Sequence, residues 1–122
     1  MAHPVVHFEI LGKDQKLLEA FYKDVFQWEI EPVDERYSVV KAGTGIHGGI
    51  GARPEYSGHV TFYIAVADIE AALERVESKG GKRSFGPHPI PDGALIAYFT
   101  DPEGHQIGLV QPPTGMEPSP SH

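Results

Sequence analysis

Two stretches of the chain, residues 5–10 and 59–64, alternate apolar and polar side chains with the two-residue period of a β-strand. Each stretch has one apolar and one polar face, and a histidine, His7 or His59, begins the polar face. The apolar faces consist of Val6, Phe8 and Ile10 in the first stretch and of Val60, Phe62 and Ile64 in the second, where Val66 continues the alternation. The pattern predicts a core on the apolar side of each strand and a candidate site on its polar side.

A helical pattern follows each of these strands. Between residues 14 and 27 apolar side chains recur every three or four positions, which predicts a helix whose apolar stripe, aromatic rings included, packs into the core. The stripe consists of Leu17, Leu18, Phe21, Tyr22, Val25 and Phe26. Asp14 is the expected N-cap of this helix, and Asp68 that of a second helix ending at Gly80 and Gly81.

The order of elements occurs twice along the chain. Further strands are expected at residues 28–32, 37–42 and 48–53, and again at 82–85, 94–100 and 105–111, with a proline-rich loop at 86–93. His7 and His59 are 52 positions apart (59 − 7), close to the repeat length, so they occupy equivalent places in the two copies. The repeat predicts an α+β protein with two βαβββ modules, each with a curved sheet and a helix on its convex side. The paired sheets are expected to leave a shared cleft.

The predicted module boundaries follow from the segments that are rich in turn-forming residues or poor in apolar ones. The first module is assigned to residues 1–53 and the second to residues 59–111. Residues 54–58 are interpreted as a linker because they are rich in turn-forming residues. Residues 112–122 are expected to be a disordered tail, since their composition offers little apolar surface to bury.

Composition excludes several classes of function. A formal net charge of −7 with scattered basic residues argues against a nucleic-acid partner, which requires a clustered cationic surface. No apolar run approaches the ~20 residues that a membrane span needs, so no membrane partner is expected. The chain has no cysteine, which excludes disulfides, thiolate metal sites and cysteine nucleophiles and agrees with a cytoplasmic location.

Three motifs carry a resemblance to a known family: His7 ahead of the Leu18–Phe26 helix, the segment 58–60 that opens the second copy, and the closing Ala97–Ile107. With these motifs the sequence resembles the vicinal oxygen chelate superfamily of glyoxalase I, bleomycin-resistance proteins, fosfomycin-resistance enzymes and extradiol dioxygenases. The resemblance extends from Val5 to Gln111. It implies the two-module fold described above and a homodimer, because small members commonly pair.

The resemblance also points to a metal site that has lost its acidic ligands. In metal-using members the first and last strands of each copy supply the ligands, and His7 and His59 fall on the two first-strand positions. The last-strand positions usually carry glutamate and here are glycine, Gly51 and Gly108. Glu9 shares a strand face with His7 and is the nearest substitute. Two interpretations therefore stand: the two histidines and Glu9 form a hydrogen-bonded polar floor, or they bind Zn, Ni, Fe or Mn.

Further residues are candidates for binding a small molecule. Arg53 is a candidate for binding an anionic group of a substrate or for forming an ion pair with Glu9. If Glu9 is not paired in this way, its carboxylate is a candidate general base. Thr61, Tyr63 and Tyr98 offer hydroxyls and ring faces beside the space left by the two glycines.

Two functions are consistent with these residues. The first is binding of a small aromatic or amphipathic molecule in the cleft, at a degenerate metal site. The alternative is a divalent-metal-dependent lyase, isomerase or dioxygenase-like enzyme that uses His7 and His59 as ligands.

Overall fold

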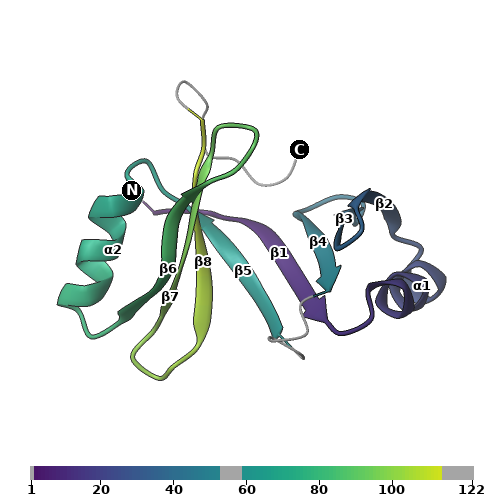
Figure 1. Cartoon of the computed structure of the whole chain (residues 1–122), viewed down its shortest axis with the longest axis horizontal. Helices are drawn as coiled ribbons and strands as arrows, with labels where there is room; N and C mark the ends of the chain where they lie inside the picture. Colours follow the sequence, from purple (N-terminus) through teal and green to yellow (C-terminus); the bar gives the residue numbers. More distant parts are fainter. Residues whose placement is uncertain (1, 53–58, 114–122) are drawn as a thin grey trace. The chain divides into compact units, whose positions relative to one another are not determined.

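A computed structural model describes residues 2–52 and 59–113 of the chain (Figure 1). Within these residues it contains eight strands and two helices, which confirms the α+β class and the twofold βαβββ order. The first set is β1 (Val5–Gly12), α1 (Gln15–Phe26), β2 (Glu29–Asp34), β3 (Tyr37–Lys41) and β4 (His47–Ala52). The second is β5 (His59–Ala65), α2 (Ile69–Ser78), β6 (Lys82–Pro89), β7 (Leu95–Thr100) and β8 (Gln106–Gln111). Arg53, the predicted linker and residues 114–122 of the predicted tail lie outside the described residues.

The chain divides into two compact units. Of the described residues, 7–52 and 59–61 form the N-terminal unit, while 2–6 and 62–113 form the C-terminal unit. In the N-terminal unit β1 pairs in parallel with β4, and β3 lies antiparallel to both β4 and β2. In the C-terminal unit β5 pairs in parallel with β8, and β7 lies antiparallel to both β8 and β6. The repeat seen in the sequence therefore produces the same strand pairing twice.

Local signals predicted the helix starts correctly. The Asp14 carboxylate accepts a hydrogen bond from the Leu17 amide at 3.0 Å, and that of Asp68 accepts one from the Ala71 amide at 3.1 Å. Both caps satisfy an amide that has no partner within its helix. Neither helix in the described part of the chain is long and apolar enough to span a membrane.

The predicted loop at 86–93 is wrong over its first half, because β6 continues to Pro89. Among the described residues, β6 is the outer strand of its unit and pairs with β7 alone. Its register shifts twice, between Arg83 and Phe85 and between Phe85 and His88. An outer strand with such irregularities tolerates proline, which cannot donate a backbone hydrogen bond.

The core of the C-terminal unit lies between α2 and one face of its sheet (Figure 1). Its buried members are Val66, Ile69, Leu73, Ala97 and Leu109, with Ile64 and Phe99 partly buried against them. The predicted apolar face of β5 is therefore only half correct. Ile64 packs on this core, but Val60 is 70% exposed and Phe62 is also exposed, whereas Thr61 and Tyr63 are buried. The core cluster beneath α2 does not extend to the first half of β5.

The predicted burial of the α1 stripe is wrong for four of its six members. Leu17, Phe21, Val25 and Phe26 are between 53% and 67% exposed, and the buried residue of the helix is Gln15. Tyr22 is half-buried and stacks on Trp28, with ring centroids 5.0 Å apart. The amphipathic pattern correctly predicted a helix here. It did not predict which side of that helix faces the sheet.

Candidate functional site

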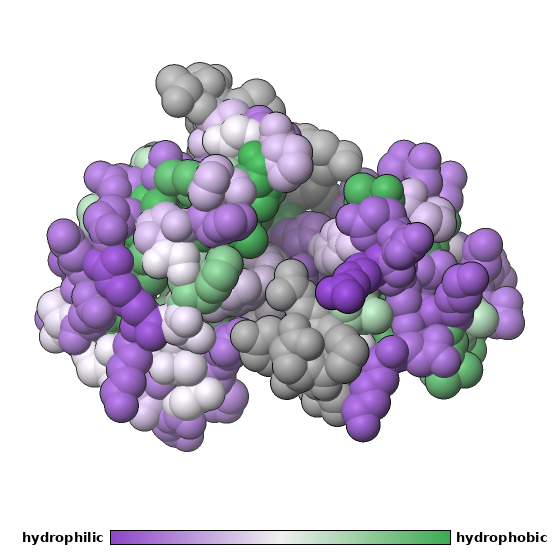
Figure 2. Space-filling model, viewed as in Figure 1, coloured by the Kyte–Doolittle hydropathy of each residue, from purple (hydrophilic) through white to green (hydrophobic). Residues whose placement is uncertain are grey.

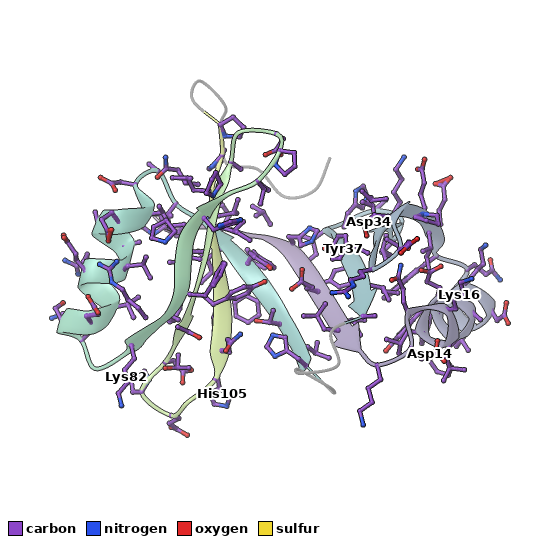
Figure 3. The ribbon with its side chains drawn as sticks, viewed as in Figure 1. Asp14, Lys16, Asp34, Tyr37, Lys82 and His105 are labelled. Atoms are coloured by element: carbon purple, nitrogen blue, oxygen red, sulfur yellow. The ribbon has the colours of Figure 1, made fainter. Side chains whose placement is uncertain are left out.

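A hydrogen-bonded polar group forms on the N-terminal unit from β1 and β3. The Tyr37 hydroxyl donates to the Glu9 carboxylate at 3.2 Å and lies 3.1 Å from Nε2 of His7. Glu9 is buried, and His7 and Tyr37 are half-buried. Figure 3 shows Tyr37 on the sheet of this unit. The predicted polar face of β1 therefore does gather into one group, but its third member was not among the predicted residues.

Tyr37 reaches β1 only because the strand between them carries glycines. β4 lies between β3 and β1, and Tyr37 is in register with Gly51 while Glu9 is in register with Gly49. A Cβ atom on Gly49 would overlap the Tyr37 hydroxyl and lie 2.8 Å from its Cε2 atom. A Cβ on Gly51 would lie 3.0 Å from Cδ1 of the same ring. The ring thus crosses β4 over two positions that have no side chain.

Burial and hydrogen bonding together determine where the protons of this group lie. Burial, and then the neighbouring His47, lower the pKa of His7 to about 4, so its imidazole is neutral at pH 7. His47 is in register with His7 on β4, which explains the second contribution. Because the single Tyr37 proton is directed to Glu9, the neutral His7 donates from Nε2–H to the phenol oxygen. The three side chains form one continuous chain of hydrogen bonds.

This arrangement does not fit a divalent metal ion. Nε2 of His7, a nitrogen that a metal would use, is already hydrogen-bonded to Tyr37. Within residues 2–52 and 59–113, no three histidine, aspartate or glutamate side chains form a group suited to hold an ion. Catalytic zinc sites use three protein ligands and a water, and the described residues, as they are arranged, do not supply three such ligands at one place. His59 lies half-buried at the start of β5.

A second group, of aromatic side chains, forms on the C-terminal unit. The hydroxyls of Tyr63 and Tyr98 are hydrogen-bonded, and the two ring centroids are 5.6 Å apart. Phe85 extends the group, with its centroid 6.0 Å from that of Tyr98. A Cβ on Gly108 would lie 2.6 Å from Cε2 of Tyr63. Gly108 therefore accommodates a tyrosine ring, as Gly49 does in the other unit. We call Tyr63, Phe85 and Tyr98 the aromatic group.

The structure brings some of the predicted site residues into contact, but not all of them. Tyr63, Tyr98 and Gly108 meet in the aromatic group, and His7 and Glu9 meet through Tyr37. Thr61 is buried in β5. Arg53, the partner proposed for Glu9, lies outside the described residues.

Sequence reasoning missed Tyr37 and the role of Gly49. The available signal was the run of glycines in β4, Gly48, Gly49 and Gly51, of which only Gly51 was interpreted from the sequence, as space beside a bound ligand. In the structure, the ring of a residue from the neighbouring strand fills that space. A glycine in a strand interior thus indicated close approach by another group.

Comparisons with known proteins agree with the fold. The sequence model described as Glyoxalase/Bleomycin resistance protein/Dioxygenase superfamily matches residues 5–109. Lactoylglutathione lyase GLX1 of Arabidopsis thaliana is 28% identical over 116 residues, which cover 82% of this chain and 40% of that protein. Putative glyoxylase CFP32 of Mycobacterium tuberculosis is 29% identical over 108 residues, covering 80% of this chain and 41% of that protein. The chain spans less than half the length of these curated relatives.

A solved structure gives the same result at the level of the fold. Methylmalonyl-CoA epimerase from Mycobacterium tuberculosis matches with a TM-score of 0.68 at 18% identity, over 88% of this chain and 87% of that chain. At this identity the match concerns architecture alone.

Proposed function

Because this chain belongs to the glyoxalase/bleomycin resistance protein/dioxygenase superfamily, we propose that it binds a small aromatic or amphipathic molecule without a metal ion. The superfamily fold hosts many chemistries, so the argument for this function comes from the side chains of the site. The contact surface in this proposal is the aromatic group of the C-terminal unit.

The observation that carries the proposal is the exposed ring of Phe85 beside the two tyrosines. Ala97, Phe99 and Leu109 pack beneath α2, so the alternating residues Tyr98 and Gly108 face the opposite side of the sheet. Phe85 is 46% exposed and stands in register with Tyr98. Its ring offers a face for stacking, next to a hydroxyl pair that can hydrogen-bond a polar edge. This combination suits a flat molecule with one polar end.

Affinity measurements test the proposal directly. Isothermal titration calorimetry with flat aromatic compounds and with aliphatic compounds of equal size should show binding of the aromatic series only. An aromatic contact contributes about 0.5–1.5 kcal/mol, so Phe85→Ala should weaken binding by roughly 2- to 10-fold. Phe21→Ala is the matched control, because Phe21 is 53% exposed but lies on α1 in the other unit. Equal losses in the two variants, or no binding of aromatic compounds, would count against the proposal.

A metal-dependent lyase or isomerase is the second candidate function. The name of the relative lactoylglutathione lyase favours it. In that function His7 and His59 would be the ligands, for Zn, Ni, Fe or Mn. Tyr37 would have to leave His7 for the ion to bind, so we derive no reaction step from the present arrangement.

Metal analysis separates the two candidates. The protein is purified without chelators, and its metal content is compared with that of a His7→Ala, His59→Ala double variant. A stoichiometric metal that disappears in the double variant would support the lyase. Metal-free protein that aromatic compounds stabilise against heat supports the binding function.

A further inference from the structure

The two register shifts in β6 determine which of its side chains lie on each side of the sheet. Arg83 is in register with Phe99, which packs on the core beneath α2, and its guanidinium forms ion pairs with two glutamates of that helix. Phe85 lies two residues further along, where a regular strand would return to the same side. Because of the first shift it is in register with Tyr98 instead, on the side opposite α2.

The second register shift brings His88 to the same side as Phe85. His88 lies three residues beyond Phe85, and residues at that spacing point to opposite sides of a regular strand. Their partners on β7, Tyr98 and Ile96, are only two residues apart and therefore share a side. The additional residue on β6 thus places the imidazole of His88 beside the Phe85 ring, with the ring centroids 5.6 Å apart.

Gly86 is the residue that allows this second irregularity. Its φ of 82° is one that residues with a side chain rarely adopt, and a Cβ atom there would lie 2.6 Å from the carbonyl oxygen of Ile96. The backbones of β6 and β7 therefore approach each other at a point where glycine is required. His88 is consequently held on a paired strand next to the aromatic group.

The strands around His88 favour an anion over a cation. β6, β7 and β8 lie wholly within the described residues and contain neither aspartate nor glutamate. The charged side chains of α2 lie on the other side of this sheet, and Figure 2 shows hydrophilic surface over that helix. Asp92, in the loop after β6, accepts a hydrogen bond from the Ala94 amide. An anionic group beside His88 thus meets no carboxylate from these strands, although the whole chain has a net charge of −7.

We propose that His88 determines the class of ligand, which is a flat aromatic molecule with a carboxylate at one end. This inference rests on the proposed binding function, in which the aromatic part of the ligand stacks on Phe85. His88 is exposed and adjoins that ring, so its imidazole is accessible to the end of a stacked molecule. A neutral imidazole donates one hydrogen bond and a protonated one adds a positive charge. Either form favours a carboxylate over an uncharged group of the same shape.

Two compounds of equal shape test the inference on the full chain. Isothermal titration calorimetry compares a naphthalene carboxylate with the matching carboxamide, which has the same rings but no charge. The parent chain should bind the carboxylate roughly 3- to 10-fold more tightly, the magnitude expected of one hydrogen bond. His88→Leu should remove this preference, and His88→Arg, which supplies a cation, should restore it. His105→Leu is the matched control and should keep the preference, because His105 lies in the turn at the opposite end of β7.

The outcomes distinguish this inference from the proposed function. If both compounds bind and His88→Leu leaves the ratio of their dissociation constants unchanged, the inference fails while the binding function stands. If neither compound binds the parent chain, both fail.

NMR spectroscopy provides a measurement that needs no substitution. Addition of the carboxylate to the parent chain should shift the imidazole signals of His88 and leave those of His105 in place. Equal shifts of both histidines, or no shift of His88, would overturn the inference even if the His88 variants failed to fold.

Discussion

Replacing Gly49 by alanine should displace the ring of Tyr37. The new Cβ atom would overlap the Tyr37 hydroxyl and lie 2.8 Å from Cε2. β4 cannot move away easily, because it is paired with β1 on one side and with β3 on the other. The ring must therefore leave its position above β4. Its hydrogen bonds to Glu9 and His7 are lost when it does.

The expected cost follows from these two contacts. Each hydrogen bond contributes about 1 kcal/mol, and leaving the buried Glu9 carboxylate without the phenol costs about 1–3 kcal/mol. The free energy of unfolding should thus fall by about 2–4 kcal/mol. In a Tyr37→Ala background the same Gly49→Ala substitution should be nearly neutral, because the ring is already absent. The coupling energy between the two positions should then be about 2 kcal/mol or more.

Urea unfolding of the parent chain, both single variants and the double variant measures this coupling. Trp28, the single tryptophan, lies in the same unit and provides the fluorescence signal. If Gly49→Ala costs the same with and without the Tyr37 ring, the ring does not lie over Gly49 and the argument fails.

Three further predictions concern stability. The pKa of His7 is lowered from 6.5 to about 4, so between these pH values the unfolded chain binds more protons than the folded chain. The free energy of unfolding should therefore fall by up to about 3 kcal/mol as the pH drops from 6.5 to 4. Urea midpoints at pH 7 and pH 4.5 check this, and a His7→Gln variant with an unchanged pH dependence would contradict it. Leu73→Ala, at the fully buried centre of the α2 core, should cost about 2–5 kcal/mol, whereas Leu17→Ala on exposed α1 should cost far less; calorimetry compares the two. Asp68→Ala should cost about 1 kcal/mol by removing the α2 cap, and Asp68→Asn, which can still cap, should restore most of it in the same calorimetric comparison.

The sequence determined the elements and their repetition. Alternation in β1, the helical period after it and the capping residues Asp14 and Asp68 are local signals, because each involves residues a few positions apart. The repeat at a spacing of 52 residues then predicted two βαβββ modules, and both are present. The sequence also predicted that His7 and Glu9 share a face.

Only the tertiary structure decided which faces are covered and what the glycines accommodate. A periodic pattern shows that one side of an element is apolar, but burial depends on whether another element packs there. For this reason Phe21 and Val60 are exposed although both belong to apolar stripes. The contact between Glu9 and Tyr37 joins residues 28 positions apart across an intervening strand. This contact forms because β4 lies between β1 and β3 and carries glycine where the Tyr37 ring crosses it. The order of strands in the sheet is not contained in any local pattern of the sequence, so the contact could not be predicted from it.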